Sequence, residues 1–170
     1  LVPEQFSSSA EALVYRHLGD ALSAYVEVAS FRTMAERILR ETGGSHVRVL
    51  DDAARAVFVR RALEALAYEV RTFARHRRNA AFCGLCADTI NELKTAGATT
   101  AKLREISRQR DEPKLAELAL IYEAYEAEIE AVALDPQDRL TLAAKRDTGK
   151  YFGGRACFID NFDGFTAPEY

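Results

Sequence analysis

The sequence predicts a mainly α-helical fold with a small parallel β part, in which strands near both ends of the chain enclose a long helical insertion. An apolar run over residues 156–159 ends at Asp160, as a buried parallel strand with a carboxylate at its C-terminal edge does. Residues 25–30 alternate and carry β-branched side chains, which is typical of a strand. From Asp51 onward, about 100 residues show helical periodicity.

Length and composition set the broad class. With 170 residues, 48% hydrophobic and 29% charged, the chain suits one soluble domain, or one domain plus a fragment. No apolar run approaches the ~20 residues that cross a bilayer, and no secretory leader is recognisable. The first residue is Leu and not Met, so we expect a piece excised from a longer protein.

Cysteine content and net charge indicate the cellular compartment and the kind of nucleic-acid contact to expect. Three cysteines, an odd number, argue against a disulfide framework and predict a reducing, cytoplasmic location. The net charge of −3 means that contact with nucleic acid would depend on a local basic patch and not on the overall field.

Caps and stops define the elements before the insertion. Residues 1–2 look like the end of a strand that Pro3 stops. Residues 6–18 are predicted to form a helix that Gly19 ends, and residues 31–42 a second helix that is followed by two glycines.

The insertion is predicted to contain four helices. The first is capped by Asp51 or Asp52 and should reach about His76, because its apolar residues recur every three or four positions. The next two are predicted over residues 80–96 and 99–110. The fourth starts at Pro113, which suits a first helical turn, and its apolar stripe consists of Leu115, Leu118, Tyr122, Tyr125, Ile129 and Val132.

The chain after the fourth helix returns to the predicted sheet. Asp135 and Asp138 flank Pro136 as the cap and third residue of another helix. That placement explains both carboxylates without metal or acid–base chemistry. A loop over residues 149–154 then leads into the final strand.

A basic cluster lies near the end of the first predicted insertion helix. Arg71, Arg75 and Arg78 are spaced by four and three residues, with His76 and Arg77 beside them. Neutralising nucleic-acid phosphates needs such a cluster, so these arginines form a candidate DNA-binding face. The alternative is an ordinary basic helix end, which the helix dipole favours.

Cys83 and Cys86 form a C-x-x-C pair. A zinc site needs four ligands, and a thioredoxin-type redox motif needs a βαβ context. Packing in the core is therefore the preferred interpretation. The same holds for Tyr122 and Tyr125, whose alternative role is stacking on bases.

Four segments together resemble a known family: LVPEQFSSSAEALVYRHLG, VEVASFRTMAERILRETGG, LDPQDRLTLAAK and CFIDNFDGFTAPE. They occur in the order seen in the B subunits of AddAB-type (RexAB-type) ATP-dependent helicase–nucleases, which resemble UvrD-like superfamily-one helicases. The resemblance covers essentially the whole chain. Its strongest parts are the opening at Pro3-Glu4-Gln5 and the closing pattern from Ile159 to Thr166.

The resemblance implies a division of the chain. Residues 1–45 would be part of a RecA-like (1A) domain of the P-loop NTPase type, residues 46–150 a helical 1B-like insertion, and residues 151–170 the return strand and motif-II-like turn. Val28-Ala29-Ser30-Phe31 would match the segment after motif Ia, which lies along single-stranded DNA. The strand-to-helix turn at Ser30, Phe31 and Arg32 is therefore a candidate DNA contact.

Asp160 and Asn161 would match motif II, where active motors carry Asp-Glu. The resemblance implies Gly after this Asp in B subunits, and here the residue is Asn161. Neither residue supplies the carboxylate that helps to position water in ATPases, so these two residues are interpreted as a degenerate nucleotide and Mg²⁺ site. Asp160 as a plain strand-end cap is the alternative.

The phosphate-binding motif of such ATPases is also missing. The chain contains no G-x-x-x-x-G-K-[ST] motif, and we identify no catalytic and no metal-binding residue. The resemblance implies no cofactor within this chain, and it assigns ATP, Mg²⁺ and an iron–sulfur cluster to the parent complex.

The preferred function is therefore the N-terminal part of a B subunit acting in DNA double-strand-break repair and recombination. This part would contact single-stranded DNA and the A subunit, while ATP hydrolysis resides mainly in the partner. Two alternatives stay open. One is an active ATP-driven helicase domain, and the other is a structural helical module that docks the A subunit through the 115–132 stripe or another apolar face.

Overall fold

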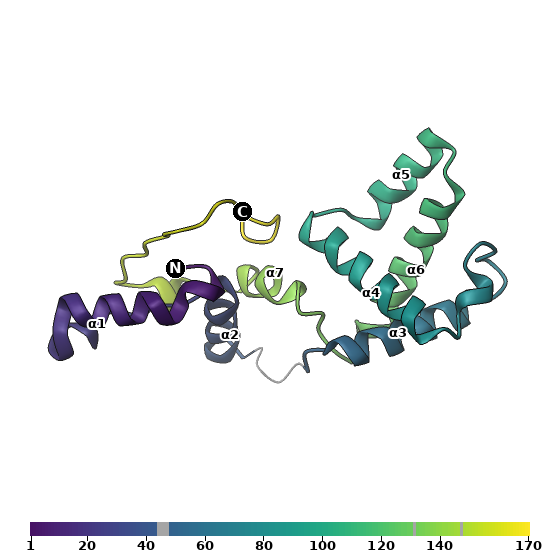
Figure 1. Cartoon of the computed structure of the whole chain (residues 1–170). Helices are drawn as coiled ribbons and strands as arrows, with labels where there is room; N and C mark the ends of the chain where they lie inside the picture. The colour runs from purple at the N-terminus through teal and green to yellow at the C-terminus, as the bar shows by residue number, and fades with distance from the viewer. Residues whose placement is uncertain (44–47, 131, 147) are drawn as a thin grey trace. The chain divides into compact units, whose positions relative to one another are not determined.

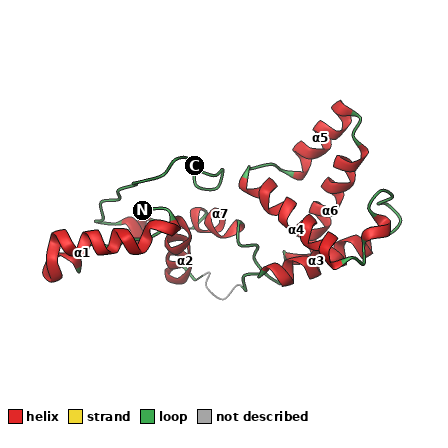
Figure 2. Cartoon of the chain, in the orientation of Figure 1, coloured by secondary structure: helices red, strands yellow, loops and turns green. Residues whose placement is uncertain are grey.

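The computed structural model describes residues 1–43, 48–130, 132–146 and 148–170, and Figures 1 and 2 show helices joined by loops. Over these residues no strand is assigned, and the one isolated β-bridge joins Val49 to Leu134. The chain divides into two compact units. Unit 1 comprises residues 1–46, 139–165 and 169–170, and unit 2 comprises residues 47–138 and 166–168.

The prediction of a parallel sheet is wrong. Residues 25–30 and 156–160 have no helical assignment, but the main-chain bonds that tie them together run through the first two residues, from Val2 N to Ala29 O and from Asp160 N to Leu1 O. A stable sheet needs a full ladder with further partner strands and a covered face. Here Phe158 and Ile159 are 78% and 54% exposed, so the apolar run is not a buried strand.

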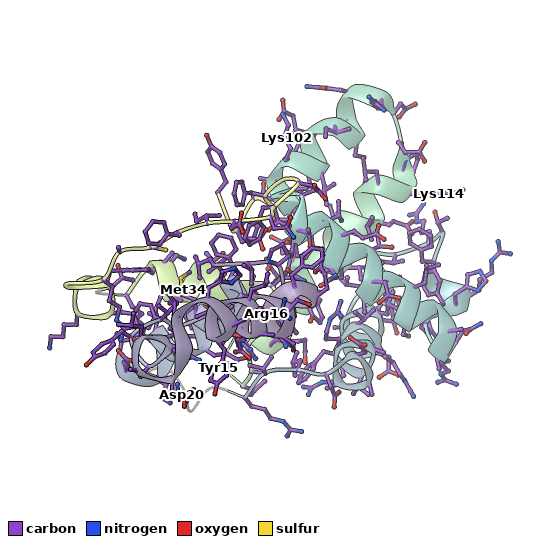
Figure 3. The ribbon with its side chains drawn as sticks, turned by 60° about the vertical axis from the view of Figure 1, so that its left-hand side comes forward. Tyr15, Arg16, Asp20, Met34, Lys102 and Lys114 are labelled. Carbon is purple, nitrogen blue, oxygen red and sulfur yellow. The ribbon has the colours of Figure 1, made fainter. Side chains whose placement is uncertain are left out.

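Unit 1 begins with a short 3-10 turn and two α-helices. A short 3-10 turn, η1 (Glu4–Phe6), precedes α1 (Ser7–Ser23), which continues past its predicted end because Gly19 (φ +67°) interrupts the helix without ending it. Figure 3 shows Tyr15, Arg16 and Asp20 on this helix, which has no buried residue. Helix α2 (Phe31–Glu41) confirms the second predicted helix.

The core of unit 1 forms around α2. Its strongly amphipathic sequence places Met34, Ala35, Ile38 and Leu39 on one buried face. Ala143 of α7 (Asp138–Ala144) and Tyr151 of α8 (Gly149–Phe152) complete this cluster.

The described part of unit 2 contains four α-helices, whose first residues agree with the predicted starts, although Asn79 was not predicted as a cap. They are α3 (Asp52–Ala65), α4 (Ala80–Thr95), α5 (Thr100–Arg110) and α6 (Pro113–Ile129). The side chains of Asp51, Asn79 and Thr99 accept hydrogen bonds from the first turns of α3, α4 and α5, which stabilises each helix start.

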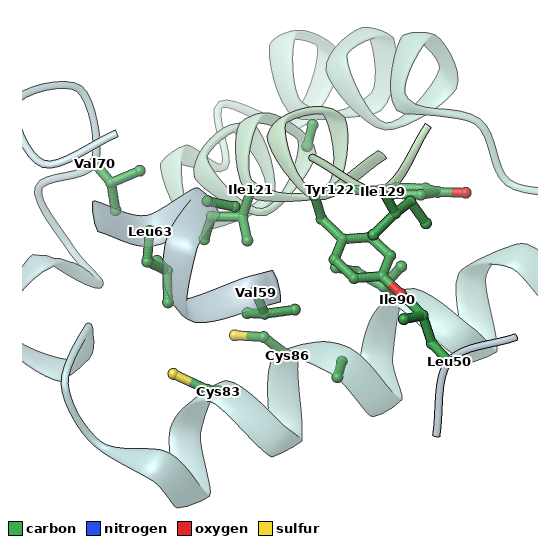
Figure 4. Close-up of a cluster of buried hydrophobic side chains, with 14 of the residues drawn as sticks. Leu50, Val59, Leu63, Val70, Cys83, Cys86, Ile90, Ile121, Tyr122 and Ile129 are labelled. Carbon is green, nitrogen blue, oxygen red and sulfur yellow. The ribbon is translucent and has the colours of Figure 1, made fainter. Parts of the chain in front are cut away.

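The core of unit 2 lies between α3, α4 and α6. Figure 4 shows Cys83, Cys86 and Ile90 of α4 facing Val59 and Leu63 of α3. Tyr122, Tyr125 and Ile129 of the apolar stripe predicted for α6 are buried and supply the third side of this core together with Ile121, which the prediction did not include. Val132, the last residue of the predicted stripe, is 59% exposed.

The segment between α3 and α4 differs from the prediction. Helix α3 ends at Ala65, and residues 66–79 form turns and a short 3-10 helix, η2 (Ala74–His76). The carboxylate of Glu117 on α6 accepts hydrogen bonds from the backbone N–H groups of Arg71, Thr72 and Phe73 at 2.8–3.1 Å. An α-helix would direct these N–H groups to carbonyls four residues earlier, so this tertiary contact replaces helical pairing.

A buried ionic cluster joins α4 to the end of α6 and the residues after it. The Lys94 side chain is 4% exposed, and its Nζ lies 2.6 Å from Asp138, 3.0 Å from Glu126 and 3.8 Å from Asp135. Asp135 is fully buried and accepts a hydrogen bond from the Tyr125 hydroxyl at 2.7 Å. The predicted helix start with Asp135 as cap and Asp138 as third residue is wrong, because α7 begins at Asp138 and residues 136–137 form a turn, while the Asp135 carboxylate pairs with core groups.

Candidate functional site

Three aromatic rings meet at the start of α2. Phe31 is the first residue of the helix, and Phe162 and Phe165 lie in the loop that follows residues 156–160. The centroids of Phe162 and Phe165 are 5.3 Å apart in a stacked arrangement, and Phe31 meets their rings edge-on at 5.3 and 6.1 Å. Phe165 is 49% exposed, whereas Phe31 and Phe162 are half-buried, so part of the ring surface of this aromatic cluster is open to solvent.

A polar network lies beside the aromatic cluster. Ser30 caps α2 by accepting the N–H of Thr33 at 3.2 Å, and its hydroxyl donates to the carboxylate of Glu4. Arg32 Nη2 lies 2.5 Å from the other oxygen of that carboxylate. The hydrogen bonds from Ser30 and then Arg32 lower the pKa of Glu4, while burial acts in the opposite direction.

The network therefore fixes two predicted DNA contacts. Ser30 is buried, whereas the Arg32 side chain is 67% exposed. Its guanidinium keeps donors free for a further anion because Glu4 engages only part of its fork. Glu4 was not predicted as a site residue. The signal that could have identified it is its charge within the Pro3-Glu4-Gln5 segment, on which the family resemblance rests.

Asp160 and Asn161 lie just before the aromatic loop. The side chain of Asp160 is exposed, and its main-chain N donates to Leu1 O at 2.9 Å. Over the described part of the chain, no three His, Cys, Asp or Glu side chains gather in a way that holds a metal ion.

Asn161 has a left-handed backbone with φ of +64°. Glycine and asparagine adopt this conformation readily, whereas other side chains are strained there by about 1 kcal/mol or more. The geometry of this turn thus accounts for Asn161 and disfavours the glutamate that active motors carry.

The predicted arginine face has a different geometry. Arg71, Arg75 and Arg78 do not share a helix face, because residues 66–79 are not an α-helix. A surface pocket of about 370 Å³ brings Arg75 and Arg78 together with Arg77, and Arg71 is not among its lining residues. This pocket belongs to unit 2, and the aromatic cluster belongs to unit 1.

The cysteine pair is buried, as its core interpretation predicts. Cys83 and Cys86 are 2% and 5% exposed, and burial raises the pKa of both thiols, that of Cys86 to about 11. Thiolates are the reactive form, so we expect a thiol reagent at pH 7.5 to label exposed Cys157 quickly and this pair only after unfolding. Mass spectrometry of the labelled chain checks this, and fast labelling of Cys86 would contradict it.

His17 bonds locally to Leu13 O at 2.8 Å on the exposed surface of α1. His46 lies outside the described residues. None of the described helices is long and apolar enough to cross a membrane.

Comparison with known proteins supplies a family for this geometry. The family model described as "ADDB, N-terminal" matches residues 1–170. The chain is 30% identical over its whole length to a protein of Clostridium tetani named as the B subunit of an ATP-dependent helicase/deoxyribonuclease, covering 16% of that protein. Proteins of the same name from Acetivibrio thermocellus and Desulforamulus reducens are each 33% identical, again over the whole chain and 15% of their own length.

Proposed function

Because this chain belongs to the ADDB N-terminal family, we propose that it is the N-terminal part of the B subunit of an ATP-dependent helicase/deoxyribonuclease and holds single-stranded DNA. The chain spans about one sixth of the curated relatives' length, so helicase action, nuclease action and a role in double-strand-break repair and recombination are part of this proposal. The relatives are named as one lettered subunit of an enzyme, which supports the presence of a partner subunit.

The observation that carries the DNA-holding role is the exposed aromatic cluster at the start of α2. Single-strand-binding proteins stack successive bases on aromatic rings and neutralise the backbone with nearby cations. Phe162 and Phe165 supply a stacked pair of rings. Arg32, next to Phe31 in the sequence, supplies a guanidinium group that Glu4 binds through one nitrogen, Nη2. Glu4 orients that guanidinium, so the cation and the rings are arranged before a strand arrives.

This proposal assigns no ATP hydrolysis to Asp160 and Asn161. The exposed carboxylate of Asp160 is followed by a left-handed residue, a turn that strains a glutamate at position 161. We propose that Asp160 and Asn161 shape the turn that presents Phe162.

A purely structural role through the 115–132 stripe has less support. That role required the stripe or another apolar face to stay exposed, but Tyr122, Tyr125 and Ile129 of the stripe lie in the core of unit 2, although Val132 is exposed. The proposal therefore keeps a partner subunit without assigning that stripe to it.

We expect that replacing both loop aromatics, Phe162→Ala with Phe165→Ala, weakens binding of the 170-residue chain to a mixed-sequence 20-nucleotide single strand by about 10- to 100-fold. The physical reason is the loss of stacking, which contributes about 1–3 kcal/mol per base. Fluorescence anisotropy with a labelled oligonucleotide at fixed salt measures the change.

The matched control is Phe152→Ala, which removes a 36% exposed ring of unit 1 outside the cluster. This control should bind as the unaltered chain does. Phe165→Trp, which keeps a stacking surface, should retain most of the affinity. If the double variant keeps its helical circular dichroism and binds DNA with unchanged affinity, the proposed site is wrong.

A further inference from the structure

Four arginines on one loop of unit 2, Arg71, Arg75, Arg77 and Arg78, have no ion pair and no side-chain hydrogen bond among the described residues. Six other basic side chains of this unit are paired with carboxylates: Arg55, Arg60, Arg61, Lys94, Lys102 and Arg104. Arg108, Arg110 and Lys114 are exposed and also lack a carboxylate partner among the described residues, so what distinguishes the four arginines is that they lie within eight residues of one another. An acidic chain that leaves four guanidinium groups of one loop unpaired has a local site for an external anion.

Three of these arginines lie around one shallow surface pocket. Arg75, Arg77 and Arg78 line this pocket of about 370 Å³ together with Ala74, and it is open to solvent. Guanidinium groups bind phosphate through two parallel N–H donors. Three of them around a small residue make a positive pocket in which no side chain supplies an acceptor.

The loop that carries the pocket is held in place by contacts with α6 and α4. Glu117 is 9% exposed and binds the N–H groups of residues 71–73, so its charge is directed at the main chain. The ring of Phe82 on α4 lies 5.4 Å from Phe73 and 5.3 Å from His76. These contacts hold the two ends of η2, and in this loop Arg75 and Arg78 are exposed and Arg77 is half-buried.

We propose that this arginine pocket, Arg75, Arg77 and Arg78, binds the phosphate backbone of a nucleic-acid strand and reads its charge and not its sequence. The choice of nucleic acid rests on the proposed function, and the phosphate chemistry rests on the unpaired guanidinium groups. The pocket would be a contact additional to the aromatic cluster of unit 1, and it would supply affinity that depends on salt.

The test is the salt dependence of binding to a labelled mixed-sequence 30-nucleotide single strand, measured by anisotropy between 50 and 300 mM KCl. For single strands the slope of log K against log salt falls by about 0.7 per phosphate contact. The variant Arg75→Gln with Arg77→Gln and Arg78→Gln should therefore flatten the slope by about 2. Its affinity at the lowest salt should fall at least about tenfold.

The matched control carries Lys102→Gln, Arg108→Gln and Arg110→Gln, which remove the same charge from exposed positions of α5. Lys102 is labelled on this helix in Figure 3. This control should keep the slope of the unaltered chain. An equal flattening in the control, or an unchanged slope in the pocket variant, would overturn the proposal in favour of a general field effect.

The aromatic and arginine results can be told apart. Loss of Phe162 and Phe165 removes stacking, which should lower the affinity by a similar factor at every salt concentration and leave the slope unchanged. Loss of the pocket arginines should change the slope. Failure of one proposal therefore does not imply failure of the other.

Discussion

Lys94→Ala is expected to destabilise unit 2 by about 3–5 kcal/mol, because it leaves buried carboxylates without their cation. Asp135, which is 0% exposed, would keep only the hydroxyl of Tyr125 and the N–H of Gln137. An isolated charge in such an environment is unfavourable by several kcal/mol. Asp138 and Glu126 would also lose their partner, although both are partly exposed.

The pKa of Lys94 agrees in sign with this role. Burial alone lowers it, but Asp135, Asp138 and Glu126 together raise it above the ordinary value of 10.5. A group whose pKa is raised by folding stabilises the fold below its unfolded pKa, and this contribution disappears as pH rises through the folded value. The stabilisation by Lys94 is therefore fully present at neutral pH.

Urea unfolding followed by circular dichroism at pH 7 measures the loss. The control is Lys102→Ala, which removes an exposed pair with Glu105 on α5 and should change the stability by less than about 1 kcal/mol. Equal stabilities of the two variants would show that the Lys94 cluster contributes no more than a surface ion pair.

Glu117→Gln is expected to destabilise unit 2 by about 2–3 kcal/mol and to release the loop over residues 66–79. Hydrogen bonds to a charged acceptor contribute about 1.5–3 kcal/mol, and this carboxylate accepts from three N–H groups. A carboxamide has one acceptor oxygen, and its NH₂ group would face donors. We expect urea unfolding to show the loss of stability and limited proteolysis to show cleavage within the released loop.

The pH dependence distinguishes this contact from ordinary packing. Burial raises the pKa of Glu117, but the N–H donors of Thr72, Arg71 and Phe73 outweigh it and lower the pKa below 4.5. A lowered pKa gives stability that is present above the unfolded value and lost as pH falls through the folded one. The unaltered chain should therefore lose stability below pH 4.5 more steeply than the variant does.

The control for this helix is Glu123→Gln, which alters a half-exposed carboxylate paired with Arg104 on the surface. That substitution should change the stability by less than about 1 kcal/mol. A loop that stays resistant to protease in Glu117→Gln would contradict the role assigned to this carboxylate.

Local signals were sufficient for most helices of this chain. Asp51, Thr99 and Pro113 mark helix starts that the structure confirms, because capping depends on residues within one turn. Asn79, which caps α4, was not predicted. The strands were predicted wrongly for a different reason. An alternating or apolar run fits a strand only where neighbouring strands complete the ladder, and a pattern within one segment does not report its neighbours.

For the candidate site, too, residues with a local sequence signal were predicted, and contacts that depend on tertiary structure were not. Phe31 and Arg32 were predicted from the resemblance, but the approach of Phe162 and Phe165 to Phe31 depends on tertiary structure. Glu117 looks like one of many surface glutamates in the sequence, and only its contact with residues 71–73 shows why the preceding helix stops early.

The discontinuity of unit 1 has a consequence for the order of folding. Its two main parts are separated in sequence by residues 47–138. The hydrogen bond from Asp160 N to Leu1 O joins the start of the first part to the second part. Closing an unstructured loop of that length has an entropic cost of about 4 kcal/mol, whereas α3 with α4 and α5 with α6 pair between chain neighbours. Unit 2 should therefore form first and, once compact, reduce the closure entropy that assembly of the aromatic cluster requires.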